Sequence, residues 1–226
     1  LILLAGAIAS AGFIRLQATA DARGASPLVP LTLFRDRNYL AGSVGIIAMG
    51  FMAAAVMLPI MLWLQTMQGI PAGEAGIIVA PMALVSLLIS PLAGIMADYV
   101  NPRILGVVGF SLLILSLLAA WWVMHVDALP WVLGLPIAGL GVGQSFIWGS
   151  NAATTLRDIS PELMGAASGV YNTSRQVGSV VGVALVSAVM QTGDPAVALI
   201  NSLLVIVVAL VVGLVSALCF RDTLQG

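Results

Sequence analysis

The chain has 226 residues, of which 61% are hydrophobic and 8% are charged, and its formal net charge is -1 at pH 7. Soluble domains carry roughly 25% charged residues, so this composition excludes a water-soluble globule and indicates a protein whose surface lies in lipid. A nearly neutral chain also lacks the basic face that a nucleic-acid partner requires.

Residues 1–14 are apolar from the first position onward and contain the stretch Ala7-Ile8-Ala9, in which two small alanines flank Ile8. Small residues also precede the cleavage site of a secretory signal peptide, but the basic leading segment of such a peptide is missing here. We therefore expect residues 1–14 to be the end of a transmembrane linker helix.

Residues 15–38 carry four of the eight arginines and end with Arg35-Asp36-Arg37 before the first long apolar stretch. The apolar residues 27–34 predict an interfacial segment that rests on the membrane and directs arginines to lipid phosphates. A plain cytoplasmic linker fits the same sequence equally well, so both interpretations stay open.

Six further apolar stretches are long enough to cross a hydrocarbon core of about 30 Å, which takes about 20 helical residues. Lipid offers the backbone no hydrogen-bond partner, so such stretches must be helices, and their glycines and prolines are too scattered for barrel strands. The sequence thus predicts an all-α integral membrane protein, with a six-helix transmembrane bundle at 39–220 and a cytoplasmic tail at 221–226. The expected spans are 39–64, 74–97, 104–124, 131–153, 165–190 and 197–220.

The arginines predict which helix ends face the cytoplasm. Seven of the eight lie before the first span, in alternate connections or in the tail, whereas the connections 65–73, 125–130 and 191–196 contain neither arginine nor lysine. The positive-inside rule makes the arginine-bearing connections cytoplasmic. We expect a multi-pass protein of the cell membrane whose C-terminus is cytoplasmic.

Helix-start signals precede three of the spans. Ser160-Pro161-Glu162 predicts an N-cap, a first-turn proline and a first-turn acid for the fifth span, and Asp194-Pro195 predicts a cap and a proline for the sixth. Glu74 begins the second span, where a negative charge stabilises the helix N-terminus. A proton-carrying role for Glu74 is the alternative.

The fourth and fifth spans carry polar side chains along one face, which is typical of helices that line an aqueous path. The third and sixth spans have few polar residues, which predicts that they brace the bundle. The residues expected to face this aqueous cavity recur at helical spacing and are Gln144, Trp148, Asn151, Asn172, Arg175 and Gln176.

Arg175 is the deepest charge expected in any span. If the fifth helix begins near Pro161, Arg175 lies about 20 Å along its axis. A guanidinium at that depth needs a partner, a water-filled cavity or a function. Two interpretations follow, participation in transport or a structural pairing with Asp158, Glu162 or helix carbonyls.

Three glycine pairs have the four-residue spacing that lets transmembrane helices approach closely. We expect each pair at a helix–helix contact. The pairs are Gly139 and Gly143, Gly165 and Gly169, and Gly178 and Gly182.

The sequence shows no motif for an enzyme or a metal site. His125 lies in a connection near Asp127 without a second His or Cys, and Cys219 lies in an apolar stretch without a partner cysteine. Phosphate-binding and dinucleotide-binding loops are also missing. We therefore expect neither enzymatic activity nor a cofactor.

The connection between the second and third spans resembles the cytoplasmic loop motif of the major facilitator superfamily. In that motif a glycine is followed four residues later by Asp and, after a turn, by basic residues, and Gly94, Asp98 and Arg103 match these positions. Asn101 stands where glycine is usual. Because Asn tolerates the left-handed conformation, Asn101 can still adopt the turn that glycine would supply.

Further stretches resemble the fourteen-span drug/proton antiporter branch of this superfamily (EmrB/QacA-type). They include residues 30–35, residues 90–94 and the run from Gly165 through Asn172 and Arg175-Gln176 to Gly182. The resemblance implies the C-terminal half of a transporter, which exports small amphipathic or cationic substrates by alternating access. It also implies that a proton gradient supplies the energy and that Asp98 and Arg103 form a cytoplasmic latch.

No Asp or Glu lies deep in an expected span. We therefore expect the proton-carrying acid in an N-terminal transporter half that is missing from this chain. Two alternatives stay open. One is a non-transporting or truncated membrane protein, and the other is an exporter of a specific metabolite such as an amino acid, a lipid or a siderophore.

Overall fold

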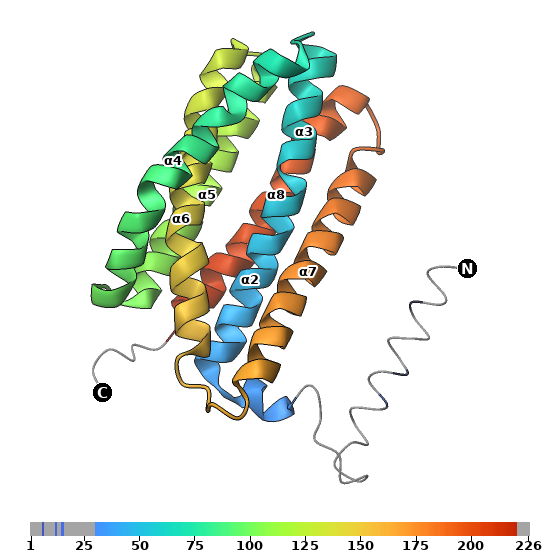
Figure 1. Ribbon diagram of the computed structural model, residues 1–226. Coiled ribbons are helices and arrows are strands. Elements are labelled where there is room, and N and C mark those ends of the chain that lie inside the picture. The colour runs from blue at the N-terminus through green and yellow to red at the C-terminus, as the bar shows by residue number, and fades with distance from the viewer. Residues whose placement is uncertain (1–5, 7–11, 13–14, 16–29, 221–226) are drawn as a thin grey trace.

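A computed structural model describes Gly6, Gly12, Arg15 and residues 30–220 of the chain. Within residues 30–220 the chain is helical apart from short connections and contains no strand. The long helices run side by side in one bundle (Figure 1). The expected linker helix at 1–14, most of the segment 15–29 and the tail at 221–226 lie outside the described residues.

The first long helix has three consecutive parts, α2 (Arg37–Ala55), α3 (Met57–Leu62) and the π-helical turn η3 (Trp63–Met67). Asp36 caps its N-terminus, because the Asp36 carboxylate accepts the Tyr39 backbone N–H at 2.7 Å. The α-helical pattern is interrupted at Val56, since Pro59 has no N–H to donate to the carbonyl four residues earlier.

The short 3-10 helix η2 (Leu31–Arg35) precedes α2. Its Leu33 is buried against Tyr39 of α2 and Ala167 of a later helix. Part of the stretch expected to rest on the membrane or to serve as a plain linker therefore packs against the bundle.

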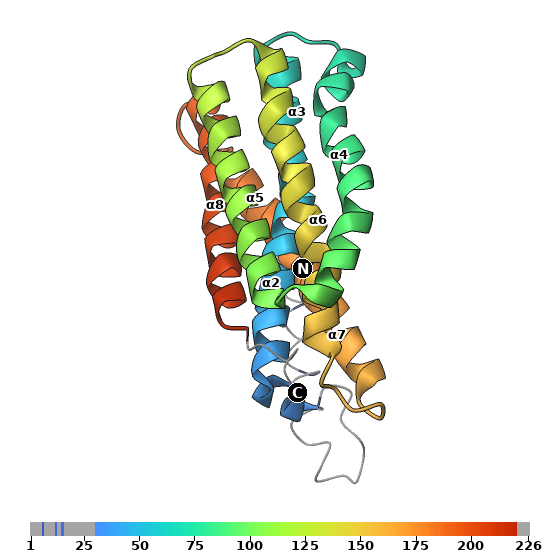
Figure 2. The same ribbon diagram turned by 90° about the vertical axis from the view of Figure 1, so that its left-hand side faces the viewer.

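The other long helices agree with the expected spans, and no boundary differs by more than three residues. Short connections join them, so successive helices run in opposite directions (Figures 1 and 2). They are α4 (Ala72–Tyr99), α5 (Pro102–His125), α6 (Gly134–Leu156) with the 3-10 turn η4 (Pro130–Leu133) before it, α7 (Met164–Val189) and α8 (Pro195–Leu218).

Of the six long helices in the described part, all but α7 are apolar and long enough to cross a membrane. The 26 residues of α7 give it sufficient length, but its polar side chains lower its hydropathy. The position of α7 must therefore depend on what it contacts.

The start of α7 differs from the expectation. Residues 160–163 form a turn, and α7 begins at Met164 without a side-chain cap. The Glu162 carboxylate is engaged within that turn, where its own backbone N–H and the Ser160 hydroxyl hold the pKa of Glu162 below its ordinary value. These groups are thus used locally instead of capping a helix.

The other two helix starts are as predicted. The Asp194 carboxylate caps α8 by accepting the backbone N–H groups of Ala196 and Val197 at 2.9 and 3.2 Å. Glu74 lies in the first turn of α4.

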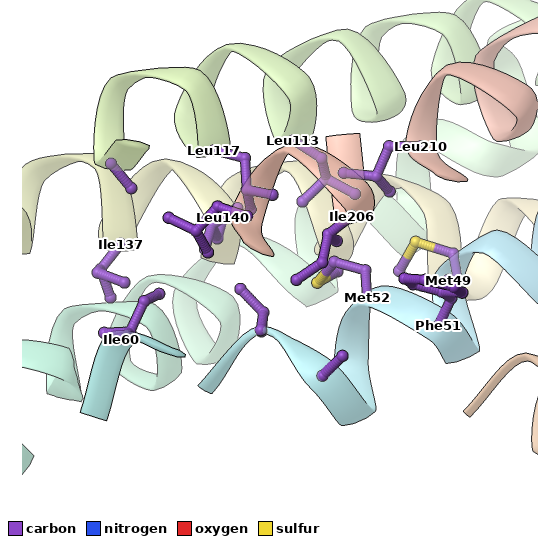
Figure 3. Packing of buried hydrophobic residues seen from close by; sticks show 14 of the residues in the cluster. Met49, Phe51, Met52, Ile60, Leu113, Leu117, Ile137, Leu140, Ile206 and Leu210 are labelled. Atoms are coloured by element: carbon purple, nitrogen blue, oxygen red, sulfur yellow. The ribbon is translucent and has the colours of Figure 1, made fainter. Parts of the chain in front are cut away.

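The long helices form two layers. α4, α6, α2 and α7 lie side by side in that order, and α5 and α8 pack together behind them (Figures 1 and 2). The rear pair corresponds to the two spans that the sequence predicts as bracing helices. Buried side chains of α2, α5, α6 and α8 meet between the layers (Figure 3), among them Met49, Met52, Leu113, Leu117, Leu140, Ile206 and Leu210.

Glycines bring the backbones of α2 and α7 close together. A Cβ atom added at Gly178 would lie 2.1 Å from the Ile47 carbonyl oxygen, and one at Gly182 would lie 2.6 Å from the Phe51 carbonyl oxygen. From the other side, a Cβ at Gly50 would lie 2.2 Å from the Arg175 carbonyl oxygen. Only residues without a side chain permit this approach.

The two other glycine pairs behave differently from each other. Gly139 and Gly143 of α6 lie against α5, where an added Cβ would meet the Ser116 hydroxyl at 2.3 Å and the Leu113 side chain at 2.8 Å. Gly165 and Gly169 have open space around them within 4 Å. In this structure, Gly165 and Gly169 therefore do not mediate the helix–helix contact that their spacing predicts.

Replacing Gly178 and Gly169 separately by alanine tests the close approach of α2 and α7. Gly178→Ala should lower the free energy of unfolding by about 1–3 kcal/mol, because the methyl group meets a backbone oxygen. Gly169→Ala is the matched control and should be neutral or stabilising by up to about 1 kcal/mol, since alanine favours helix. Unfolding in detergent measures both, and equal effects would contradict the contact.

Candidate functional site

The first half of α7 has an exposed polar side. Asn172, Thr173 and Gln176 are exposed there, together with Gly165 and Gly169. Asn172 donates to the Ser168 carbonyl at 3.0 Å, a bond within the helix that leaves the amide oxygen of Asn172 outward for other partners.

The second half of α7 is apolar on its exposed side. Val177, Val180 and Val181 are 50%, 70% and 42% exposed, respectively. Polarity therefore changes along the helix, from polar near residues 165–176 to apolar from Val177 onward.

Arg175 lies eleven residues after the first residue of α7, which places it about 17 Å along the helix axis. It is half-buried, and its charge acts on the Tyr171 hydroxyl one turn earlier. Within residues 30–220, no ion pair joins Arg175 to Asp158 or Glu162. The structure thus does not show the carboxylate pairing that was one interpretation of this residue.

Gln144 of α6 contacts α4, because its amide nitrogen Nε2 donates to the Ser86 hydroxyl at 2.7 Å. Ser86 in turn donates to the Gly141 carbonyl at 3.1 Å, and Ser90 donates to the Ser145 hydroxyl at 3.4 Å. These residues form a polar ladder between the two helices.

Sequence reasoning missed the α4 side of this ladder. The available signal was the four-residue spacing of Ser86 and Ser90 in an otherwise apolar helix, which puts both hydroxyls on one face.

Trp148 is half-buried and packs against the hydrophobic core. It therefore keeps part of its indole available at the surface of α6.

Asn151 does not line a cavity in this structure, contrary to the expectation. Only 3% of its surface is exposed, and its amide nitrogen donates to the Gly42 carbonyl at 3.0 Å and to the Tyr171 hydroxyl at 2.9 Å. The reason is that its face of α6 packs against α2, whose Gly45 leaves room for the Asn151 side chain.

The loop motif lies where α4 ends and α5 begins. Gly94 is exposed, Asp98 is in the last turn of α4, and Arg103 is exposed in the first turn of α5. Asn101 caps α5, because its side chain accepts the Arg103 backbone N–H at 2.9 Å.

Asn101 does not use the left-handed conformation that it tolerates, since its φ is -50° and its ψ is 123°. The next residue is Pro102, and a residue before proline is held in the extended region.

The predicted site residues thus fall into two groups on the front layer of helices. Gln144 faces α4, whereas Asn172, Arg175 and Gln176 belong to α7 at the other edge. α2 lies between α6 and α7, and no hydrogen bond joins Gln144 to residues 172–176 in the described part of the chain. The arrangement supplies two polar surfaces in this layer of the bundle, and Arg175 lies in the second of them, between Asn172 and Gln176.

The sequence matches the Major Facilitator Superfamily over residues 1–183. The chain belongs to this superfamily. This membership and the names of its relatives point to the transporter class and not to an enzyme.

Its relatives include named exporters. The chain is 35% identical over 182 residues to an uncharacterised MFS-type transporter of Mycobacterium tuberculosis, with 79% of this chain and 31% of the relative covered. It is 30% identical over 200 residues to the tetracenomycin C resistance and export protein of Streptomyces glaucescens, with 85% and 35% covered. It is 27% identical over 170 residues to the multidrug resistance protein Stp of M. tuberculosis, with 75% and 31% covered. The chain therefore spans about a third of the length of these relatives.

A double-mutant cycle on Gln144 and Ser86 tests the polar ladder. Because the pair is hydrogen-bonded between helices, Gln144→Ala and Ser86→Ala should show a coupling energy of about 0.6 kcal/mol in detergent unfolding. Gln176→Ala replaces Gln144→Ala in the control cycle and should show no coupling with Ser86→Ala. A coupling of zero for Gln144 would contradict the contact.

Proposed function

We propose that the chain forms the C-terminal half of a proton-coupled exporter of the fourteen-span drug/proton antiporter branch, and that it moves small amphipathic or cationic molecules by alternating access. The names of relatives support export of small toxic molecules, since they include a tetracenomycin C export protein and multidrug resistance proteins. The coverage of about a third of each relative supports the assignment to one part of a longer transporter.

The exposed polar side of α7 carries this proposal. Amide and guanidinium groups are costly in contact with hydrocarbon, and a helix that bears them near its middle needs protein or water beside it. No other helix in residues 30–220 covers that side of Asn172 and Gln176. A second bundle across a water-filled cavity supplies both the protein and the water that α7 needs beside it. Rocking of the two bundles then gives alternating access.

We propose that Gln144, Trp148, Asn172, Arg175 and Gln176 line the substrate side of this cavity. Gln144 and Trp148 lie on α6 and the other three on α7, so the two groups border the cavity from both sides of α2. The half-exposed indole of Trp148 offers an apolar surface, whereas the amides offer hydrogen bonds, which suits an amphipathic molecule.

Energy coupling requires an acid that changes its protonation inside the pathway. The acids of residues 30–220 lie in connections or in terminal helix turns, as Glu74, Asp98 and Asp194 illustrate. We therefore assign the proton-carrying acid to the N-terminal half of the transporter. We also propose that Asp98 and Arg103 form a cytoplasmic latch between the conformations of the transporter.

The arginine-bearing helix ends meet at one end of the bundle. The Arg37 Nε atom donates to the Cys219 carbonyl at 2.8 Å, which ties the start of α2 to the end of α8. The ends of α4 and α6, near Arg103 and Arg157, lie at the same end (Figure 1). We propose that this end faces the cytoplasm, because positive residues are retained there.

Replacing Arg175 tests the transport role in the complete transporter, that is, the chain together with its N-terminal half. Arg175→Ala should reduce efflux by at least about tenfold, because the one cation among the five lining residues proposed here is lost, while the amount inserted in the membrane stays the same. Val177→Ala on the adjacent exposed position is the control and should retain efflux. Normal efflux by Arg175→Ala would remove this residue from the mechanism.

A further inference from the structure

The two halves of α7 are held to the bundle by different means. The second half lies against α2 through Gly178 and Gly182, where backbone meets backbone. Gly165 and Gly169 in the first half make no such contact. In this half, glycine packing reaches only Arg175, whose carbonyl oxygen lies against Gly50 of α2, so other contacts must hold the turns from Gly165 to Tyr171.

Two tyrosine hydroxyls provide that attachment. The Tyr39 hydroxyl of α2 donates to the Ala167 carbonyl of α7 at 2.9 Å, and both groups are buried. One helical turn further on, the Tyr171 hydroxyl accepts the Asn151 amide of α6 at 2.9 Å. These bonds hold the turns of α7 around Ala167 and Tyr171, where Gly165 and Gly169 make no close backbone approach.

Asn151 is the point where three helices meet. The same amide nitrogen donates to the Gly42 carbonyl of α2 and to Tyr171 of α7, while Asn151 itself belongs to α6. α6 and α7 have few other contacts, so this bond is the main polar connection between them within residues 30–220.

Tyr171 sets the direction of its neighbours. Its ring is buried in the main core, and successive residues of a helix are rotated by about 100°. With Tyr171 held inward, Asn172 and Gln176 are exposed and Arg175 is half-buried between them. Freeing the Tyr171 hydroxyl would loosen the first half of α7, because the Tyr39 bond would be left as its polar attachment in the described residues, beside the apolar packing of Ala167.

We infer that Asn151 and Tyr171 are positioning residues, which hold the first half of α7 so that Asn172, Arg175 and Gln176 face the cavity, and that Asn151 does not contact substrate. The part of this inference that concerns the cavity rests on the proposed function. The part that concerns the attachment of α7 does not.

Thiol labelling tests the attachment without any transport. In a Cys219→Ser background, Ala167→Cys and Val186→Cys each introduce one thiol on α7 at positions that are both 0% exposed. Tyr171→Phe keeps the ring and removes only the hydroxyl. It should raise the rate at which N-ethylmaleimide labels position 167 by about fivefold to tenfold in detergent. This factor is the increase in the open population that the loss of one buried hydrogen bond would cause.

Position 186 is the matched control, because it lies beyond the glycine contacts and should keep its rate. Asn151→Ala should act in the same direction as Tyr171→Phe at position 167. An unchanged rate at 167, or an equal rise at both positions, would overturn the inference, since neither outcome is a local release of the first half of α7.

Transport kinetics in the complete transporter test the role in positioning. Tyr171→Phe and Asn151→Ala should each raise KM for two chemically different substrates by the same factor, about threefold to tenfold, and change the maximal rate less. A factor for Asn151→Ala that differs between the substrates would show direct contact and overturn the positioning role. If no variant or parent transports, the proposed function fails, whereas the labelling result still decides how α7 is attached.

Discussion

The contact between α2 and α7 is the constraint on which the rest of the structure depends. α7 is the one long helix in residues 30–220 that is not apolar enough to be stable in lipid by its composition alone. Glycines let its backbone lie directly on α2, and a longer side chain at Gly178 would meet the Ile47 carbonyl oxygen. Dispersion contacts over this surface stabilise α7 in the bundle without requiring its exposed side to be apolar.

The bundle thereby separates two tasks between its layers. α5 and α8 pack behind the front layer and contribute apolar side chains to the shared core (Figure 3). α6 and α7 carry the polar groups, and α2 lies between them. This division gives a bundle that is apolar at the back and chemically varied at the front. It also explains why polar helices occur in a chain with only 8% charged residues.

Much of the fold could be predicted from the sequence, because lipid allows few alternatives. Apolar stretches in hydrocarbon must be helices, so the six helix positions followed from hydropathy to within three residues. Local contacts were harder to predict. Ser160 and Glu162 satisfy each other in a turn, and Pro102 holds Asn101 in an extended conformation, so both sites depart from the motif pattern. Asn151 shows the main limit of prediction from sequence. A polar residue on a helix face can bond to a neighbouring helix or line a cavity, and only tertiary contacts distinguish the two.

The account stands on α7 crossing the membrane despite its polar side, and the sidedness of its two ends tests this most directly. In a Cys219→Ser background, Ser160→Cys and Thr192→Cys place single thiols at exposed positions before and after the helix. A membrane-impermeant maleimide should label position 192 in intact cells and position 160 only after permeabilisation. Labelling of both positions from the same side would contradict the account, because α7 would then not span the bilayer.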